Sequence, residues 1–148
     1  MGLFSFLKNA GAKIFNAESE EEIRARKMIT LKGVVADTRI SVENLDIDLD
    51  DDKVTVYGQT ESQANKEKVI LALGNVEGVA TVDDRISVVT PEPESRFYTV
   101  QSGDSLSKIS KEMYGDPMKY NAIFEANQPM LKDPNLIYPG QVLRIPNL

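Results

Sequence analysis

Five aspartates lie close together in the middle of the chain and offer carboxylate oxygens to a metal ion: Asp46, Asp48, Asp50, Asp51 and Asp52. A calcium loop needs oxygens that converge on one point, usually with a glycine in its sharp turn and a bidentate glutamate at its twelfth position. The run contains neither, and its first aspartates alternate with apolar residues as the solvent face of a strand does. A solvated strand face followed by a turn therefore explains these aspartates better than a calcium site.

The side chains most used in catalysis are missing, because the chain has no histidine and no cysteine. Histidine is the usual general base near neutral pH and the commonest transition-metal ligand. Without cysteine, no disulfide can staple a small secreted fold. Carboxylates remain available for acid-base chemistry, but no spaced pair of them stands out. The composition therefore argues against an enzyme and against a zinc site, and it suits the cytoplasm.

Main-chain oxygens offer a different kind of ion site at the end of a predicted helix. That helix ends at Leu73 and runs into residues 74–79, where two glycines let the backbone turn its carbonyls inward. Potassium-selective sites replace water with neutral carbonyl dipoles, and the last turn of a helix has four carbonyls without intrahelical partners. A short N-terminal helix offers a second such end around residues 7–10. From spacing alone, an ordinary helix cap at Gly74 and an ordinary turn at Gly78 are the simpler interpretation.

The overall composition is that of a soluble globular protein. The chain has 148 residues, of which 41% are hydrophobic and 27% charged, enough for one ordinary domain or two small ones. Its formal net charge is −6 and its pI is about 4.7. Phosphate binding requires clustered lysine and arginine, so we expect no nucleic-acid partner.

Residues 1–16 predict a short amphipathic helix, because their apolar residues recur at intervals of three and four. Lys8 and Lys13 make only a weak basic face, which favours docking on the domain that follows over binding to a membrane surface. These lysines also interrupt the apolar run, unlike a secretory signal, and no run approaches the roughly 20 apolar residues that span a bilayer. We therefore expect a cytoplasmic protein without stable membrane insertion.

Residues 17–89 predict a small α/β sandwich with helices on one face of a sheet. Helix caps and hydrophobic periodicity set the elements, with Gly33 as a stop signal and Thr60 or Ser62 as an N-cap. In order, they are a helix over 18–32, hairpin strands over 45–50 and 54–58, a helix over 61–73 and a strand over 79–89.

Residues 90–96 contain two prolines and no apolar residue, which predicts a linker between two domains. The segment 97–148 then predicts a strand over 97–100, a helix over 105–113 capped by Asp104, a second helix from Asp116-Pro117 to about Ala126, and a strand over 142–145. The expected fold class is therefore α+β with two small domains, the second in βααβ order.

The segment 97–148 resembles the LysM family of βααβ glycan-binding modules. The resemblance rests on FYTV, SGDSLSKIS, the YGD turn, IFEANQ and IYPGQVLRIP, in the family's order and spacing. It implies binding of N-acetylglucosamine polymers such as peptidoglycan, in a groove formed here by Gly103, Asp104, Ser105, Asn127, Ile137, Tyr138 and Pro139. The alternative is that Tyr138 only packs against the second strand and Asp104 only caps a helix.

Residues 53–58, KVTVYG, and residues 76–84, VEGVATVDD, resemble a BON domain. With the MGLF N-terminus and the LysM-like segment, the whole chain resembles bacterial potassium-binding proteins of BON-plus-LysM architecture. This resemblance implies potassium bound in the BON half. Combining it with the helix-end argument, we expect backbone carbonyls at Leu7, Ala10, Gly74, Val76, Gly78 and Val79 to hold the ion.

Two functions follow from these resemblances. The first is a monomeric, non-enzymatic cytoplasmic potassium sensor or buffer, with the LysM module as a stabilising or protein-interaction partner. The second is a peptidoglycan-binding module of the cell envelope. The sequence does not specify the ion affinity, the selectivity over rubidium or caesium, the downstream partner, or how the two domains are arranged.

Overall fold

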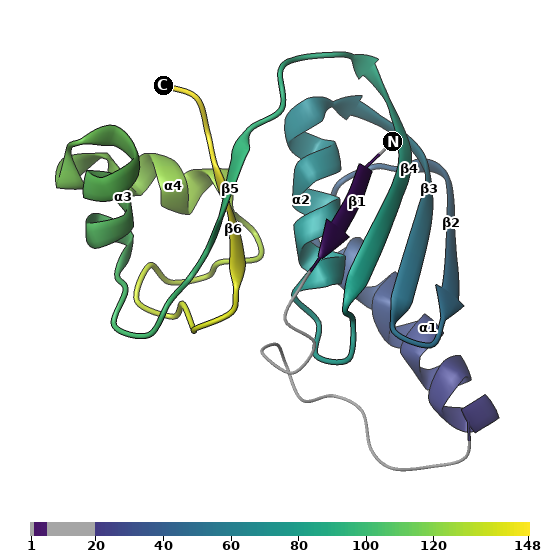
Figure 1. Cartoon of the computed structure of the whole chain (residues 1–148). Coiled ribbons are helices and arrows are strands. Elements are labelled where there is room, and N and C mark those ends of the chain that lie inside the picture. The colour runs from purple at the N-terminus through teal and green to yellow at the C-terminus, as the bar shows by residue number, and fades with distance from the viewer. Residues whose placement is uncertain (1, 6–19) are drawn as a thin grey trace.

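The computed structural model describes residues 2–5 and 20–148, which form an α+β fold with two units (Figure 1). The first unit contains β1 (Gly2–Ser5), α1 (Glu20–Asp37), β2 (Glu43–Asp50), β3 (Lys53–Ser62), α2 (Gln63–Gly74) and β4 (Thr81–Thr90). The second unit contains β5 (Arg96–Thr99), α3 (Leu106–Tyr114), the 3-10 helix η1 (Pro117–Lys119), α4 (Tyr120–Ala126) and β6 (Val142–Ile145). The predicted fold class is confirmed.

The first unit is a four-stranded sheet in the order β1-β4-β3-β2, with α1 and α2 packed on one face. β3 and β4 run parallel and are joined by α2, whereas β2 pairs antiparallel with β3. Alternate strand residues such as Ile47, Val54 and Val82 are buried against the helices, while Asp46 and Asp48 are exposed. This is the period of two from which a half-buried strand was predicted.

The predicted N-terminal helix is wrong at its start, because Gly2–Ser5 is strand β1, paired antiparallel with β4. A sheet edge presents unpaired N–H and C=O groups, and pairing with it satisfies the main chain of a short segment. The remainder of the predicted helix lies outside the described residues.

Gly33 does not end the first helix, since α1 continues through it to Asp37. Leu31 and Val35 lie on the buried face of the helix, with 0% and 3% of their surface exposed. Their packing outweighs the roughly 1 kcal/mol that a glycine costs inside a helix.

The predicted helix caps are partly right. Ser62 caps α2 by accepting a hydrogen bond from the Asn65 amide at 3.2 Å, and Asp116 caps η1 through Met118. Asp104 does not cap α3, because Ser105 accepts the Lys108 amide instead. Because α3 begins one residue later than predicted, at Leu106, Ser105 is the side chain that reaches the third helical amide.

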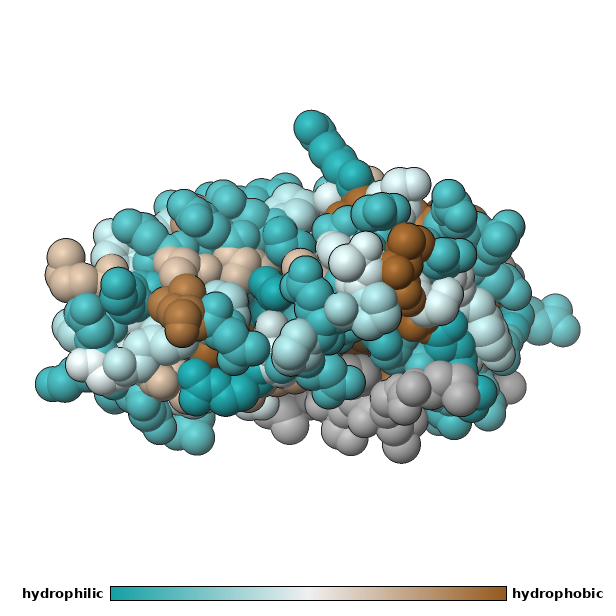
Figure 2. All heavy atoms as spheres, turned by 90° about the horizontal axis from the view of Figure 1, so that it is seen from above, coloured by the Kyte–Doolittle hydropathy of each residue, from teal (hydrophilic) through white to brown (hydrophobic). Residues whose placement is uncertain are grey.

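The surface is mostly hydrophilic on the face drawn in Figure 2, where hydrophobic residues form small separate patches. Within residues 2–5 and 20–148, no helix combines the length and apolar character that crossing a bilayer requires.

Gly58 in β3 is required by both space and backbone conformation. Its φ is +149°, and an added Cβ would lie 2.6 Å from the Val42 Cγ1 atom and 2.9 Å from the Glu43 carbonyl oxygen. These atoms belong to the region where the β2–β3 register shifts.

We expect Gly58→Ala to lower the free energy of unfolding by about 2 kcal/mol, because backbone atoms must move to admit the methyl group. Gly33→Ala is the matched control, because its Cβ meets nothing within 4 Å in the middle of α1. It should instead raise stability by about 0.5 to 1 kcal/mol. Urea denaturation measures both variants, and equal effects would contradict the steric argument.

Candidate functional site

Helix α2 positions the candidate ion site, and the helix itself is buried on nearly every side. Its C-terminal half is continuously buried from Val69 to Gly74. One side packs against β3 and β4, and another against β6 of the second unit. A helix that is apolar all round needs such cover on more than one face.

The chain makes a tight turn where α2 ends. The Asn75 amide donates to the Leu71 carbonyl at 3.0 Å, the Val76 amide to Leu73 at 3.3 Å, and the Val79 amide to Val76 at 3.2 Å. Gly78 has φ +99°, in the left-handed region that glycine adopts without strain. The turn therefore reverses the chain while leaving several carbonyls without a main-chain partner among the described residues.

The carbonyl oxygens of Gly74, Gly78 and Val79 accept no hydrogen bond from any residue that the structure describes. The Val76 carbonyl accepts one hydrogen bond among the described residues, from the Val79 amide, and a carbonyl oxygen has two lone pairs. These four oxygens belong to one turn at the negative end of a helix dipole. Neutral carbonyls are the donors that potassium-selective sites use. The predicted Leu7 and Ala10 carbonyls lie outside the described residues.

Glu77 is a feature of this turn that the sequence argument missed. Its Oε2 atom is buried and has no hydrogen-bond partner in the part of the chain that the structure describes. A buried unpaired carboxylate oxygen is costly, and a cation in the same turn would reduce that cost. The sequence places this acid between Gly74 and Gly78, and that position could have identified Glu77 as part of the candidate site.

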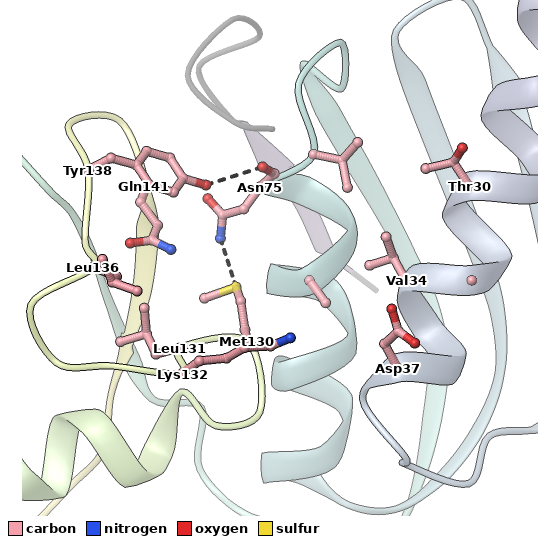
Figure 3. A pocket seen from close by; sticks show the side chains of 13 residues that line it. Thr30, Val34, Asp37, Asn75, Met130, Leu131, Lys132, Leu136, Tyr138 and Gln141 are labelled. Carbon is pink, nitrogen blue, oxygen red and sulfur yellow. Dashed lines mark hydrogen bonds between the residues drawn. The ribbon is translucent and has the colours of Figure 1, made fainter. Parts of the chain in front are cut away.

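Asn75 fastens the turn to the second unit. Its Nδ2 donates to the Val142 carbonyl at 2.9 Å, and its Oδ1 accepts the Val142 amide at 2.8 Å. The Tyr138 hydroxyl also donates to the Asn75 carbonyl at 3.3 Å, as Figure 3 shows. The Asn75 side chain thus pairs with strand β6 as another strand's peptide group would.

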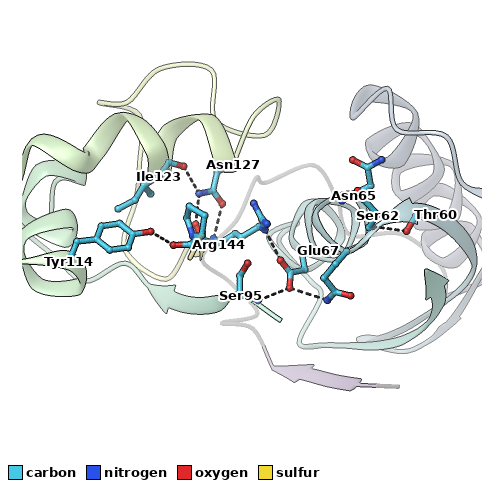
Figure 4. Close-up of polar contacts among 11 residues, drawn as sticks. Thr60, Ser62, Asn65, Glu67, Ser95, Tyr114, Ile123, Asn127 and Arg144 are labelled. Atoms are coloured by element: carbon cyan, nitrogen blue, oxygen red, sulfur yellow. Dashed lines mark hydrogen bonds and ion pairs between the residues drawn. The ribbon is translucent and has the colours of Figure 1, made fainter. Parts of the chain in front are cut away.

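A buried ion pair between α2 and β6 also joins the two units. Arg144 Nε donates to Glu67 Oε1 at 2.6 Å, and the Glu67 side chain is 1% exposed (Figure 4). Its Oε2 accepts the Ser95 amide at 2.9 Å and Gln63 Nε2 at 3.1 Å. Burial raises the pKa of Glu67, but the hydrogen bonds from Arg144, Ser95 and Gln63 outweigh it and hold the pKa below its ordinary value.

The β5–α3 loop holds three of the predicted glycan-contacting residues, Gly103, Asp104 and Ser105. Asp104 accepts the Tyr98 hydroxyl at 2.6 Å and the Gln101 amide at 2.9 Å. The hydrogen bond to Asp104 raises the pKa of Tyr98 to about 12. These bonds organise the loop from within.

The remaining predicted glycan-contacting residues lie at and after the end of α4. Asn127 is buried, and its amide group bonds the Ile123 carbonyl and both main-chain groups of Arg144. Tyr138 contacts Asn75, while Ile137 packs on the second core and Pro139 is exposed. Asn127 is therefore fully used inside the protein.

The acidic run forms the strand face and hairpin turn that were predicted. Asp51 and Asp52 make the turn between β2 and β3, and Asp48 faces Arg24 at 3.5 Å. Across the described part of the chain, no group of three or more acidic side chains is arranged to hold a metal ion.

Comparison with known proteins identifies two consecutive domains. The sequence model of the BON domain matches residues 29–90, and that of the LysM domain matches residues 98–146. The chain is also 48% identical over 147 residues to the "Potassium binding protein Kbp" of Escherichia coli, and the match covers 99% of each chain. The chain belongs to the Kbp family.

A further relative shares a shorter region. An uncharacterized protein of Deinococcus radiodurans is 55% identical over 49 residues, which are 33% of this chain and 19% of that protein. Membership of the Kbp family, unlike this partial match, accounts for the whole chain and confirms the predicted order of a BON domain followed by a LysM domain.

Asn75→Ala should lower the free energy of unfolding by about 2 kcal/mol, because it leaves both main-chain groups of Val142 without their partner. Asn121→Ala, an exposed position on α4, is the control and should change stability by less than about 0.5 kcal/mol. Urea denaturation of both variants measures the difference. An Asn75 variant as stable as the control would contradict the bridging role.

Glu67 should make the free energy of unfolding depend on pH in the acidic range. The folded protein holds the pKa of Glu67 below the ordinary value of about 4.3, so the stabilisation that Glu67 provides is complete above that pH. The contribution is lost as the pH falls through the lowered pKa of the folded state. Glu67→Gln should remove this loss and lower stability at pH 7 by about 3 kcal/mol.

Urea denaturation between pH 7 and pH 3 measures this contribution. Glu125→Gln, on the exposed face of α4, is the matched control and should follow the parent protein. If the Glu67 and Glu125 variants have the same pH profile, the buried pair does not carry the acid dependence.

Proposed function

We propose that this protein binds potassium through main-chain carbonyl oxygens at the end of α2 and acts as a non-enzymatic, cytoplasmic, monomeric ion sensor. The observation that carries the proposal is the turn after α2, where Gly74, Gly78 and Val79 present carbonyls without donors among the described residues. The name of the Escherichia coli relative, potassium binding protein, supports the same ion.

The chemistry of the donors favours a weakly hydrated monovalent cation. Neutral carbonyl dipoles replace the water of potassium at lower cost than they replace the tightly held water of a small divalent ion. The buried Glu77 oxygen adds negative potential near the turn. The carbonyls of Leu7 and Ala10 complete the proposed ligand set, which would join the N-terminal segment to the turn.

Binding of an ion to this arrangement gives a sensor by mass action. An ion that binds only the assembled site shifts the population toward that arrangement. The hydrogen bonds of Asn75 to β6 connect the turn directly to the second unit. We propose that the LysM unit stabilises the ion-binding half through this contact.

The protein should melt at a higher temperature in potassium than in sodium at equal ionic strength. At a potassium concentration of about 100 times the Kd, binding raises the free energy of unfolding by about 2.7 kcal/mol. Calorimetric melting measures the shift, and removal of residues 1–15 should abolish it. Equal melting curves in the two salts would overturn the proposal.

Gly78→Ala should reduce the potassium-dependent shift, because it strains the backbone that orients the proposed ligands. Gly103→Ala is the matched control, since Gly103 also has a positive φ, +86°, and lies in the β5–α3 loop. The control should melt earlier in both salts yet keep the full difference between them. A control that loses the difference equally would show that general destabilisation is responsible.

Peptidoglycan binding is a second candidate, carried by the match of residues 98–146 to the LysM domain. Because Asn127 is used internally, the exposed β5–α3 loop and Pro139 would have to supply most of the contacts. Sedimentation with insoluble peptidoglycan tests this candidate, and protein that stays in the supernatant would remove it.

A further inference from the structure

A cleft separates α1 from the segment between α4 and β6, and α2 forms its floor. Its main cavity has a volume of about 740 Å³, and an adjoining hollow of about 210 Å³ extends it past Asp37 and Pro129. Figure 3 shows the cleft, with Thr30, Val34 and Asp37 on one wall and Leu131, Lys132 and Leu136 on the other. The main cavity lies within the 300–1,000 Å³ that small-molecule sites occupy.

Apolar side chains form most of the cleft surface. Val34 and Ala72 lie on the helical side, and Met130, Leu131 and Leu136 on the opposite side. Leu136 is 66% exposed at the rim, although it is a large hydrophobic residue. An occupant with apolar side chains would remove this surface from water.

One buried amide oxygen in the cleft wall has no partner among the residues that the structure describes. Gln141 is only 4% exposed, and its Oε1 atom is buried without a hydrogen bond from any of these residues. Rotation about the last torsion of a glutamine can turn either end of the amide toward an occupant. An unsatisfied oxygen in an apolar wall can accept a hydrogen bond from an occupant that carries donors of its own.

Opposite charges face each other across the cleft. Figure 3 shows Asp37 and Lys132 extending from opposite walls, and both residues are exposed. Within residues 2–5 and 20–148, neither side chain forms an ion pair. The cleft therefore offers a carboxylate at one wall and an ammonium group at the other.

We propose that this cleft binds a short apolar peptide with free termini. Asp37 would hold its ammonium group and Lys132 its carboxylate, while Gln141 bonds a peptide group. The apolar side chains of the peptide would pack against Val34 and Leu136. The cleft adjoins the turn that carries the proposed ion ligands, because Val76 also lines it, but the proposal does not rest on potassium binding.

Titration calorimetry of the full chain with the tripeptide Leu-Ala-Leu tests the proposal. We expect saturable binding of one peptide per chain. Lys132→Gln and Gln141→Met should each weaken it about tenfold, which corresponds to about 1.4 kcal/mol. The controls Lys119→Gln and Gln101→Met, at exposed positions outside the cleft, should bind like the parent protein.

A peptide with an acetylated N-terminus and an amidated C-terminus tests the role of the charges. It should bind at least tenfold more weakly than the free peptide. Equal affinity of the two peptides would overturn the assignment of Asp37 and Lys132 to the termini. No heat of binding from the free peptide, or cleft variants that bind like the controls, would overturn the proposed site.

Discussion

Burial of α2 on opposite sides is the constraint on which the rest of the structure depends. Leu71 and Leu73 are 1% and 0% exposed, so the helix has little surface left for water. Two neighbouring residues form buried ion pairs in different directions. Lys66 pairs with Asp84 of β4 at 2.8 Å, and Glu67 pairs with Arg144 of β6 at 2.6 Å.

The first unit therefore depends on the second unit to bury part of its core. Val142 lies in the same hydrophobic cluster as the α2 side chains, and Phe97 and Met130 pack against that cluster. Without this cover, α2 would expose apolar surface and the Glu67 carboxylate would lose its charged partner. The 90–96 segment joins two units that share one buried helix.

The turn after α2 is held from both sides as a result. On the sheet side, the Asp52 carbonyl accepts the Ala80 and Thr81 amides at 2.9 and 3.3 Å. On the other side, Asn75 bonds β6. A turn fixed on both sides is preorganised, which the proposed ion site would require. The chain has no histidine or cysteine to bind a metal ion, and main-chain carbonyl oxygens are neutral ligands that it can offer instead.

Local patterns were sufficient to predict every strand except β1, and several caps. Alternation identified β2, and β6 was predicted over 142–145 as the structure has it. The β1 strand and the bridge from Asn75 to Val142 depend on partners 67 or more positions away, which no local periodicity records. The same reason hid Gln141, whose buried Oε1 atom has no hydrogen-bond partner among the described residues. The Leu7 and Ala10 assignments stay predictions.

The most direct measurement of the central claim is carbonyl carbon NMR of the isotopically labelled protein during a potassium titration. The account predicts that the carbonyl resonances of Gly74, Val76, Gly78 and Val79 shift together and saturate with potassium, while sodium at equal ionic strength leaves them unchanged. Shifts confined to the carboxylates of the β2–β3 turn, with the carbonyls after α2 unaffected, would contradict it.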